Sequence, residues 1–206
     1  MDGCMTKNAY YKAIETFRNH YGLLRTQQAI DKGITPRTLY QMQETGLILR
    51  ESRGLYRLAD TEPGAYFDLV QVALRVSKGV ICLISALSFH GLTTQIPHQV
   101  YIALPIDAEK PRVEYPPLKI FWLSPKTYSA SIEQHELDGI PVKIYGIEKT
   151  IADCFKFRNK IGLDLALEAL RDYAEHRHLD VEKILYYANL NRVENIVRPY
   201  LEMLLT

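Results

Sequence analysis

The segment Gly33-Ile34-Thr35-Pro36 constrains the fold of this chain more than any other. Glycine permits a tight turn, threonine is a favoured N-cap, and proline is favoured at the first helical position, where its missing N–H costs nothing. The segment therefore predicts a short helix over 26–32, with Thr26 as its N-cap, and a second helix over 36–45 that stops at Gly46. Two short helices joined by a tight glycine turn form a helix-turn-helix.

The flanking sequence extends this motif in both directions. Before it, apolar residues at i, i+3, i+4 and i+7 predict an amphipathic helix over 10–19. After it, residues 47–58 predict a β-hairpin with Gly54 in its turn. A hairpin directly after the second helix of the motif is a wing, so residues 1–60 are predicted to form a winged helix-turn-helix. Lys32 departs from the general pattern, in which an apolar residue is more usual at that position.

A module of this kind binds double-stranded DNA through its third helix, which enters the major groove. With Leu39 and Met42 facing the core, Arg37 is predicted to read guanine and Gln41 adenine, each at about 1–3 kcal/mol of discrimination. The arginines of the wing are predicted to hold phosphates. The predicted DNA contacts are Arg25, Thr26, Thr35, Arg37, Thr38, Tyr40, Gln41, Arg50, Arg53 and Arg57. The charge distribution gives mild support to DNA binding, since residues 1–60 carry nine Lys and Arg against six Asp and Glu.

Residues 61–206 are predicted to form a second domain after a linker at 61–64. Helices are expected at 67–76 and 79–90, followed by strands at 99–104, 118–123, 132–137 and 140–145. Helices return at 147–158, 163–176, 180–190 and 193–204, with Asp180 as an N-cap and Pro199 kinking or interrupting the last helix. The predicted fold class is α+β, a winged helix-turn-helix followed by helices around a small antiparallel sheet.

Two blocks carry a resemblance to a known family. They are Ser85-Ala86-Leu87-Ser88-Phe89-His90-Gly91-Leu92 and Gly146-Ile147-Glu148-Lys149-Thr150-Ile151-Ala152-Asp153-Cys154. Placed behind a winged helix, they resemble the antitoxins of the abortive-infection (AbiE-type) type IV toxin–antitoxin systems of phage defence. The resemblance, from about Tyr11 to Leu205, implies a repressor of its own operon whose C-terminal domain counteracts a nucleotidyltransferase-like toxin. Both blocks consist mainly of apolar and small residues, so packing explains them as well.

Catalysis is not expected. No Asp or Glu is followed at i+2 by Lys, as a restriction-type nuclease requires, and the six histidines show no metal-ligand spacing. Phosphate-binding glycine motifs and GxSxG are absent, so neither a cofactor nor a metal is predicted. The longest apolar stretch, 80–89, is too short to span a membrane. Three widely spaced cysteines indicate reduced thiols in a cytoplasmic protein.

Three interpretations remain open: an autorepressor that is also an antitoxin, a one-component regulator with a ligand-binding or dimerisation domain, and a scaffold that does not bind DNA. The first predicts an inverted-repeat operator bound by two copies, either as a homodimer or as monomers cooperating on DNA. It also predicts a cognate toxin as a partner. The sequence does not locate the toxin-binding surface. The basic residues Lys156, Arg158 and Lys160 are equally compatible with DNA, solvent or a protein partner.

Overall fold

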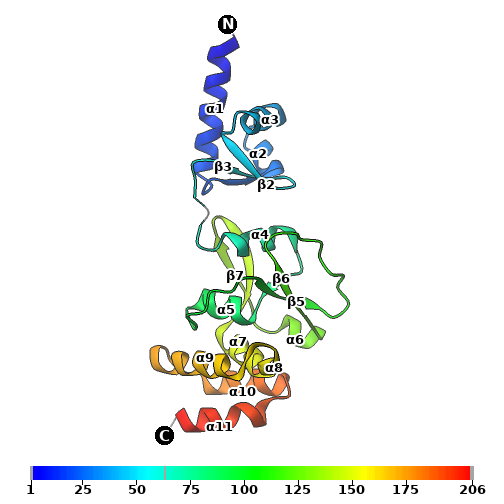
Figure 1. Ribbon diagram of the computed structural model, residues 1–206, viewed down its shortest axis with the longest axis vertical. Coiled ribbons are helices and arrows are strands. Elements are labelled where there is room, and N and C mark those ends of the chain that lie inside the picture. Colours follow the sequence, from blue (N-terminus) through cyan, green and yellow to red (C-terminus); the bar gives the residue numbers. More distant parts are fainter. Residues whose placement is uncertain (1, 63, 205–206) are drawn as a thin grey trace. The chain divides into compact units, whose positions relative to one another are not determined.

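A computed structural model describes residues 2–62 and 64–204, with side chains from residue 8 onward. The chain divides into two compact units, Met1–Phe67 and Asp68–Thr206 (Figure 1). This division falls a few residues after the predicted boundary at 60/61 because the start of the linker is bonded to the first unit. Arg18 forms an ion pair with Asp60 at 2.9 Å, and the Arg57 guanidinium donates to the Thr61 carbonyl.

The N-terminal unit is a winged helix-turn-helix. Its elements are α1 (Asp2–Arg18), β1 (Leu23–Arg25), α2 (Thr26–Asp31), α3 (Pro36–Glu44), β2 (Ile48–Ser52) and β3 (Leu55–Leu58). The three strands form an antiparallel sheet in the order β1-β3-β2. Phe17, Leu24, Ala29, Leu39 and Met42 lie in one buried core that joins the three helices to the sheet.

The signals around the predicted turn are confirmed. Thr35 is the N-cap of α3, and its Oγ1 accepts a hydrogen bond from the Thr38 main-chain N–H at 3.1 Å, with Pro36 in the first turn. The predicted N-cap of α2 is wrong: Arg25 occupies that position and Thr26 is already helical. The cap works through Gln28 instead, whose Oε1 accepts from the Arg25 main-chain N–H at 3.0 Å.

The first helix of the C-terminal unit is α4 (Phe67–Arg75); its residue Phe67 is assigned to the N-terminal unit. The following elements are β4 (Val80–Ile81), α5 (Leu83–His90), β5 (Val100–Pro105), β6 (Leu118–Leu123) and α6 (Pro125–Ser129). The unit continues with β7 (Ile132–Leu137), β8 (Ile140–Tyr145), α7 (Ile147–Lys156), α8 (Arg158–Ile161), α9 (Leu163–His176), α10 (Val181–Leu190) and α11 (Glu194–Leu204). Asp180 caps α10 as predicted, accepting from the Lys183 main-chain N–H at 3.0 Å. The helix α11 runs through Pro199 without the predicted interruption.

The α+β fold class is confirmed, but the sheet is mixed rather than antiparallel. Its strand order is β6-β5-β4-β8-β7, with β5–β6 and β4–β8 parallel and the other two pairs antiparallel. The long connection 106–117 lets β6 return in the direction of β5. The two-residue strand β4 separates β5 from β8. The sequence predicted helix at these two residues, because β4 is too short to show a period of two.

Both faces of this sheet are buried. On one face, Val80, Ala103, Phe121 and Tyr145 share a core with residues of α5, α7, α9, α10 and α11. The other face carries Ile81, Ile102 and Ile144, which are fully buried and aligned across three strands. The helix α4, with Val70 and Val72 buried, lies on the other side of the sheet from α5 and α7 (Figure 1). In the part of the chain that is described, no helix is both long and apolar enough to cross a membrane.

Candidate nucleic-acid interface

The third helix of the N-terminal unit presents two of the predicted DNA-reading side chains to solvent. Leu39 and Met42 are buried beneath α3, so the helical period turns Arg37 and Tyr40 outward. Arg37 lies in the first turn of α3, and 63% of Tyr40 is exposed. A guanidinium at this end of a recognition helix can donate two parallel hydrogen bonds to the major-groove edge of guanine.

Three other predicted residues of this region already have partners within the protein. The Tyr10 hydroxyl lies 3.4 Å from Gln41 Oε1, so the half-buried Gln41 amide faces α1. The Thr35 and Thr38 hydroxyls lie 2.9 Å apart and form a hydrogen bond. The Thr35 hydroxyl is therefore occupied in holding the start of the helix. These internal hydrogen bonds compete with contacts to a base edge.

The wing brings together predicted residues that are distant in the sequence. The Thr26 main-chain N–H donates to the Gly54 carbonyl at 2.9 Å, which fastens the tip of the hairpin to the beginning of α2. Gly54 has a φ of +75°, a conformation that favours glycine. Arg25 and Arg53 are both exposed and lie next to this contact. The signal that the sequence analysis missed is β1, a strand of three residues that aligns Arg25 with Leu55.

Arg57 does not belong to this exposed set. Its Nε pairs with Glu51 Oε1 at 2.6 Å, with side-chain exposures of 13% for the arginine and 20% for the glutamate. The same guanidinium donates to the main-chain carbonyls of Leu58 and Thr61. Arg57 therefore stabilises the hairpin and the beginning of the linker. Arg50, by contrast, is exposed, with its Nε 3.3 Å from the Ser52 carbonyl.

Two charged side chains of the C-terminal unit are fully buried in its core. Lys149 and Asp153, exposed by 0% and 1%, form an ion pair at 2.5 Å between Nζ and Oδ2. The Asn191 amide donates to the other carboxylate oxygen at 2.6 Å, and the ammonium lies 4.4 Å from the centre of the Tyr145 ring. Burial raises the pKa of the neighbouring Cys154 thiol well above its usual value. Their burial and their mutual hydrogen bonds indicate a structural role in the core of this unit.

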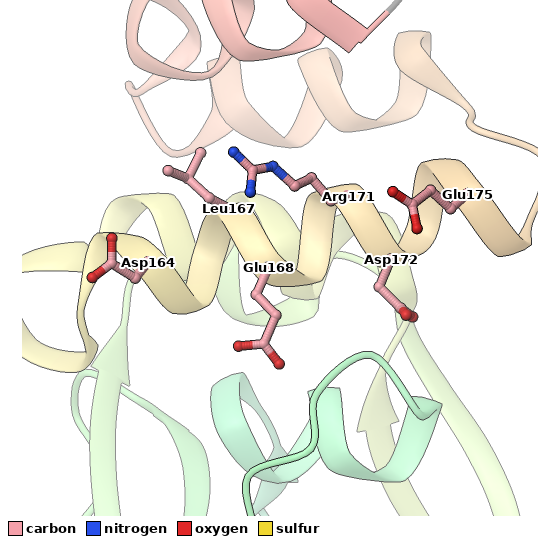
Figure 2. A pocket seen from close by; sticks show the side chains of 6 residues that line it. All are labelled: Asp164, Leu167, Glu168, Arg171, Asp172 and Glu175. Carbon is pink, nitrogen blue, oxygen red and sulfur yellow. The ribbon is translucent and has the colours of Figure 1, made fainter.

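A hollow of about 390 Å³ lies along α9 and is strongly acidic. Four carboxylates, those of Asp164, Glu168, Asp172 and Glu175, line it together with Arg171 and Leu167. In Figure 2, Glu168 and Asp172 point to one side of α9 and Arg171 to the other. Glu168 accepts weak hydrogen bonds from Thr93 Oγ1 and the Thr94 main-chain N–H, at 3.3 and 3.4 Å. Within residues 2–62 and 64–204, no group of three His, Cys, Asp or Glu side chains is placed to hold a metal ion.

The basic residues Lys156, Arg158 and Lys160 each contact a neighbouring group of the protein. Lys160 lies 5.7 Å from the centre of the Phe121 ring, and Lys156 Nζ is 3.4 Å from Asn191 Oδ1. Arg158 donates to the Phe155 carbonyl at 3.0 Å. Lys156 and Arg158 are half-buried, whereas Lys160 remains exposed.

The two blocks that carry the resemblance make contacts within the core. The helices α5 and α7 pack against each other. The buried Ser85 Oγ accepts from the Tyr101 main-chain N–H at 2.9 Å, and His90 Nε2 lies 2.8 Å from the Tyr145 carbonyl. These bonds fasten α5 to β5 and to the end of β8. Hydrogen bonding therefore accounts for Ser85 and His90 of the first block.

Comparison with known families identifies the N-terminal module. Residues 12–59 match the family described as "Transcriptional regulator, AbiEi antitoxin". The matched segment begins within α1 and ends just after β3, so it covers the helix-turn-helix and the wing. No curated protein matches the chain.

Among solved structures, the chain is similar to the RV2827C protein from Mycobacterium tuberculosis, with a TM-score of 0.57. The alignment covers 95% of this chain and 81% of that protein, at 10% sequence identity. At this level of identity the similarity concerns the fold alone. It extends over both units of this chain.

Proposed function

Because residues 12–59 match the AbiEi antitoxin family of transcriptional regulators, we propose that this chain represses transcription of its own operon by binding operator DNA. The observation that supports this proposal most is that Arg37 is exposed in the first turn of α3. In a recognition helix, it is this N-terminal end that contacts base edges. Arg37 is assigned to guanine, and Tyr40 contacts the same groove. Arg25, Arg50 and Arg53 contact phosphates and fix the orientation of the module.

The second part of the proposal concerns residues 61–206. We assign to this domain the antitoxin activity, directed against a nucleotidyltransferase-like toxin. Support comes from the family of the N-terminal module and from the closed core of the C-terminal unit. Within the described residues, the Lys149 and Asp153 pair is fully buried, which suits a domain that acts by binding rather than by catalysis.

The one-component regulator is the second candidate, with the hollow along α9 as its ligand site. A small-molecule pocket is usually concave and mostly apolar, with a few convergent polar groups. The α9 hollow is lined by four carboxylates, one guanidinium and one leucine, and all six residues come from a single helix. This chemistry does not fit a typical small-molecule site, so the antitoxin is favoured.

The proposed DNA binding is tested by a mobility shift with the chain and the DNA upstream of its own gene. The Arg37→Ala variant is expected to lose discrimination between operator and random DNA by about 1–3 kcal/mol, or roughly 5- to 150-fold. Arg18→Ala is the matched control, because Arg18 is exposed at the C-terminal end of α1, is not among the predicted DNA contacts, and pairs with Asp60. If the wild type binds operator and random DNA equally, the proposal is wrong and the module is a protein-interaction domain.

A second experiment tests whether DNA binding and toxin neutralisation reside in different units of the chain. Arg37→Ala and Arg53→Ala are expected to weaken operator binding and to leave neutralisation of a co-expressed toxin unchanged, because both side chains lie in the N-terminal unit. A folded variant that loses both activities would show that one surface serves both. Two copies are expected per inverted-repeat operator, which the stoichiometry of the shifted complex measures.

A further inference from the structure

A groove lined by both apolar and polar residues runs between α1 and the turn of the helix-turn-helix. It has a volume of about 360 Å³. Lys12 and Thr16 line it from α1, and Lys32, Thr35 and Thr38 line it from the turn and the beginning of α3. The two lysines are exposed, whereas Thr16 and Thr38 are half-buried. The groove therefore lies beside the end of the recognition helix that is assigned to the DNA bases.

The charge of this groove has one sign. Its floor is formed by the buried side chains of Ala13 and Ile34, and none of its lining residues is acidic. Two carboxylates adjoin lining residues in the sequence, Glu15 beside Thr16 and Asp31 beside Lys32. Asp31 accepts a hydrogen bond from Gln27 Nε2 at 2.9 Å, one turn back along α2. Asp31 weakens the local positive potential but leaves the Lys32 ammonium on the groove. Lys32 is also the residue that departs from the usual helix-turn-helix pattern.

The position of the groove relative to the wing is informative. The tip of the wing is bonded to Thr26 at the beginning of α2, and Lys32 follows the last residue of α2. Six residues of α-helix are about 9 Å long, comparable with the ~12 Å width of the major groove. Arg25 and Lys32 therefore place a cation at each end of α2, at a separation comparable with the width of the groove that the third helix is proposed to occupy.

From this geometry we infer that Lys12 and Lys32 bind phosphates of the DNA strand opposite the one held by the wing. The inference rests on the proposed function, because it requires α3 to lie in the major groove. A lysine ammonium is a compact charge that contacts phosphate without reading sequence. The two lysines therefore contribute to affinity and orientation and leave base discrimination to α3.

The test is the salt dependence of DNA binding by Lys12→Ala/Lys32→Ala, measured by fluorescence anisotropy on operator and random duplexes. Each lost phosphate contact lowers the slope of log K against log salt concentration by about 1. The double variant is expected to lose about 2 units of slope on both duplexes, with an unchanged ratio of operator to random affinity. Lys110→Ala/Lys126→Ala removes the same charge from exposed sites of the C-terminal unit and is expected to keep the wild-type slope. Lys12→Arg/Lys32→Arg keeps the charge and should also keep the slope, provided circular dichroism shows that the variants are folded.

The outcomes distinguish the inference from the proposed function. A wild-type slope in the alanine variant, with operator binding intact, overturns the phosphate assignment and leaves the proposed function standing. A fall in the affinity ratio also overturns it, since the lysines would then discriminate between sequences. If the wild type shows no preference for its operator and no dependence on salt, the proposed function fails and the inference fails with it.

Discussion

The buried ion pair of α7 allows a quantitative prediction about the C-terminal unit. Lys149→Met removes the ammonium while keeping a side chain of similar length. It leaves the Asp153 carboxylate, exposed by 1%, with the Asn191 amide as its remaining partner. Removing one partner of a buried pair typically costs about 3–5 kcal/mol, because the other charge stays in a medium of low dielectric constant. Asp153→Leu should cost a similar amount, since it leaves the ammonium buried.

The double variant Lys149→Met/Asp153→Leu is expected to be far more stable than the sum of the single losses. An apolar replacement of a whole buried pair is often close to neutral. The remaining loss of unfolding free energy, about 1–3 kcal/mol, arises because the Asn191 amide loses its carboxylate acceptor. Two independent single losses would total about 6–10 kcal/mol. The double-mutant cycle should therefore give a coupling energy of at least about 3 kcal/mol.

Urea unfolding followed by tryptophan fluorescence measures this directly. The chain has one tryptophan, Trp122, and it lies in the C-terminal unit, so the signal reports that unit. With a urea m value of about 2 kcal/mol/M, a loss of ~4 kcal/mol lowers the midpoint by about 2 M. The matched control is Lys156→Met, which removes a half-buried ammonium 3.4 Å from Asn191 Oδ1 and should cost under about 1 kcal/mol. A loss below ~1 kcal/mol for Lys149→Met, or additivity in the double variant, would refute the reasoning.

Three further predictions concern local features. Thr35→Ala removes the N-cap of α3 and should lower the free energy of opening of that helix by about 1 kcal/mol, measured by amide hydrogen exchange; Thr35→Ser should restore it. Burial lowers the pKa of His90, so protonation favours the unfolded state. The C-terminal unit should therefore lose stability as the pH falls from about 7 to about 5.5, and urea midpoints of His90→Gln should vary less over this range. Burial also raises the pKa of Cys82 and Cys154, so in a Cys4→Ser background a thiol reagent should modify neither cysteine until the unit unfolds; modification of the native protein would contradict their burial.

The sequence by itself determined the features that depend on neighbouring residues. Thr35 and Pro36 act within one helical turn, and the α3 helix begins where they predict. Asp180 caps α10 for the same reason. Gly54 permits the positive φ of the hairpin turn, so the wing follows from a short stretch of chain. Capping, turn formation and helical periodicity involve residues a few positions apart, and these are the interactions that a single sequence displays.

The tertiary structure decided what depends on distant segments. The two residues of β4 form a strand because β5 and β8 lie on either side of them, and the sheet is mixed because the β4–β8 and β5–β6 pairs are parallel. Gln41 faces Tyr10 of α1, and Arg57 pairs with Glu51 and the linker, although the helical and hairpin patterns placed both on the DNA-binding surface. Lys149 and Asp153, ordinary charged residues by sequence, are buried as a pair between elements far apart in the chain. Strand order, burial and side-chain partners arise from long-range packing, which the local signals of a single sequence do not specify.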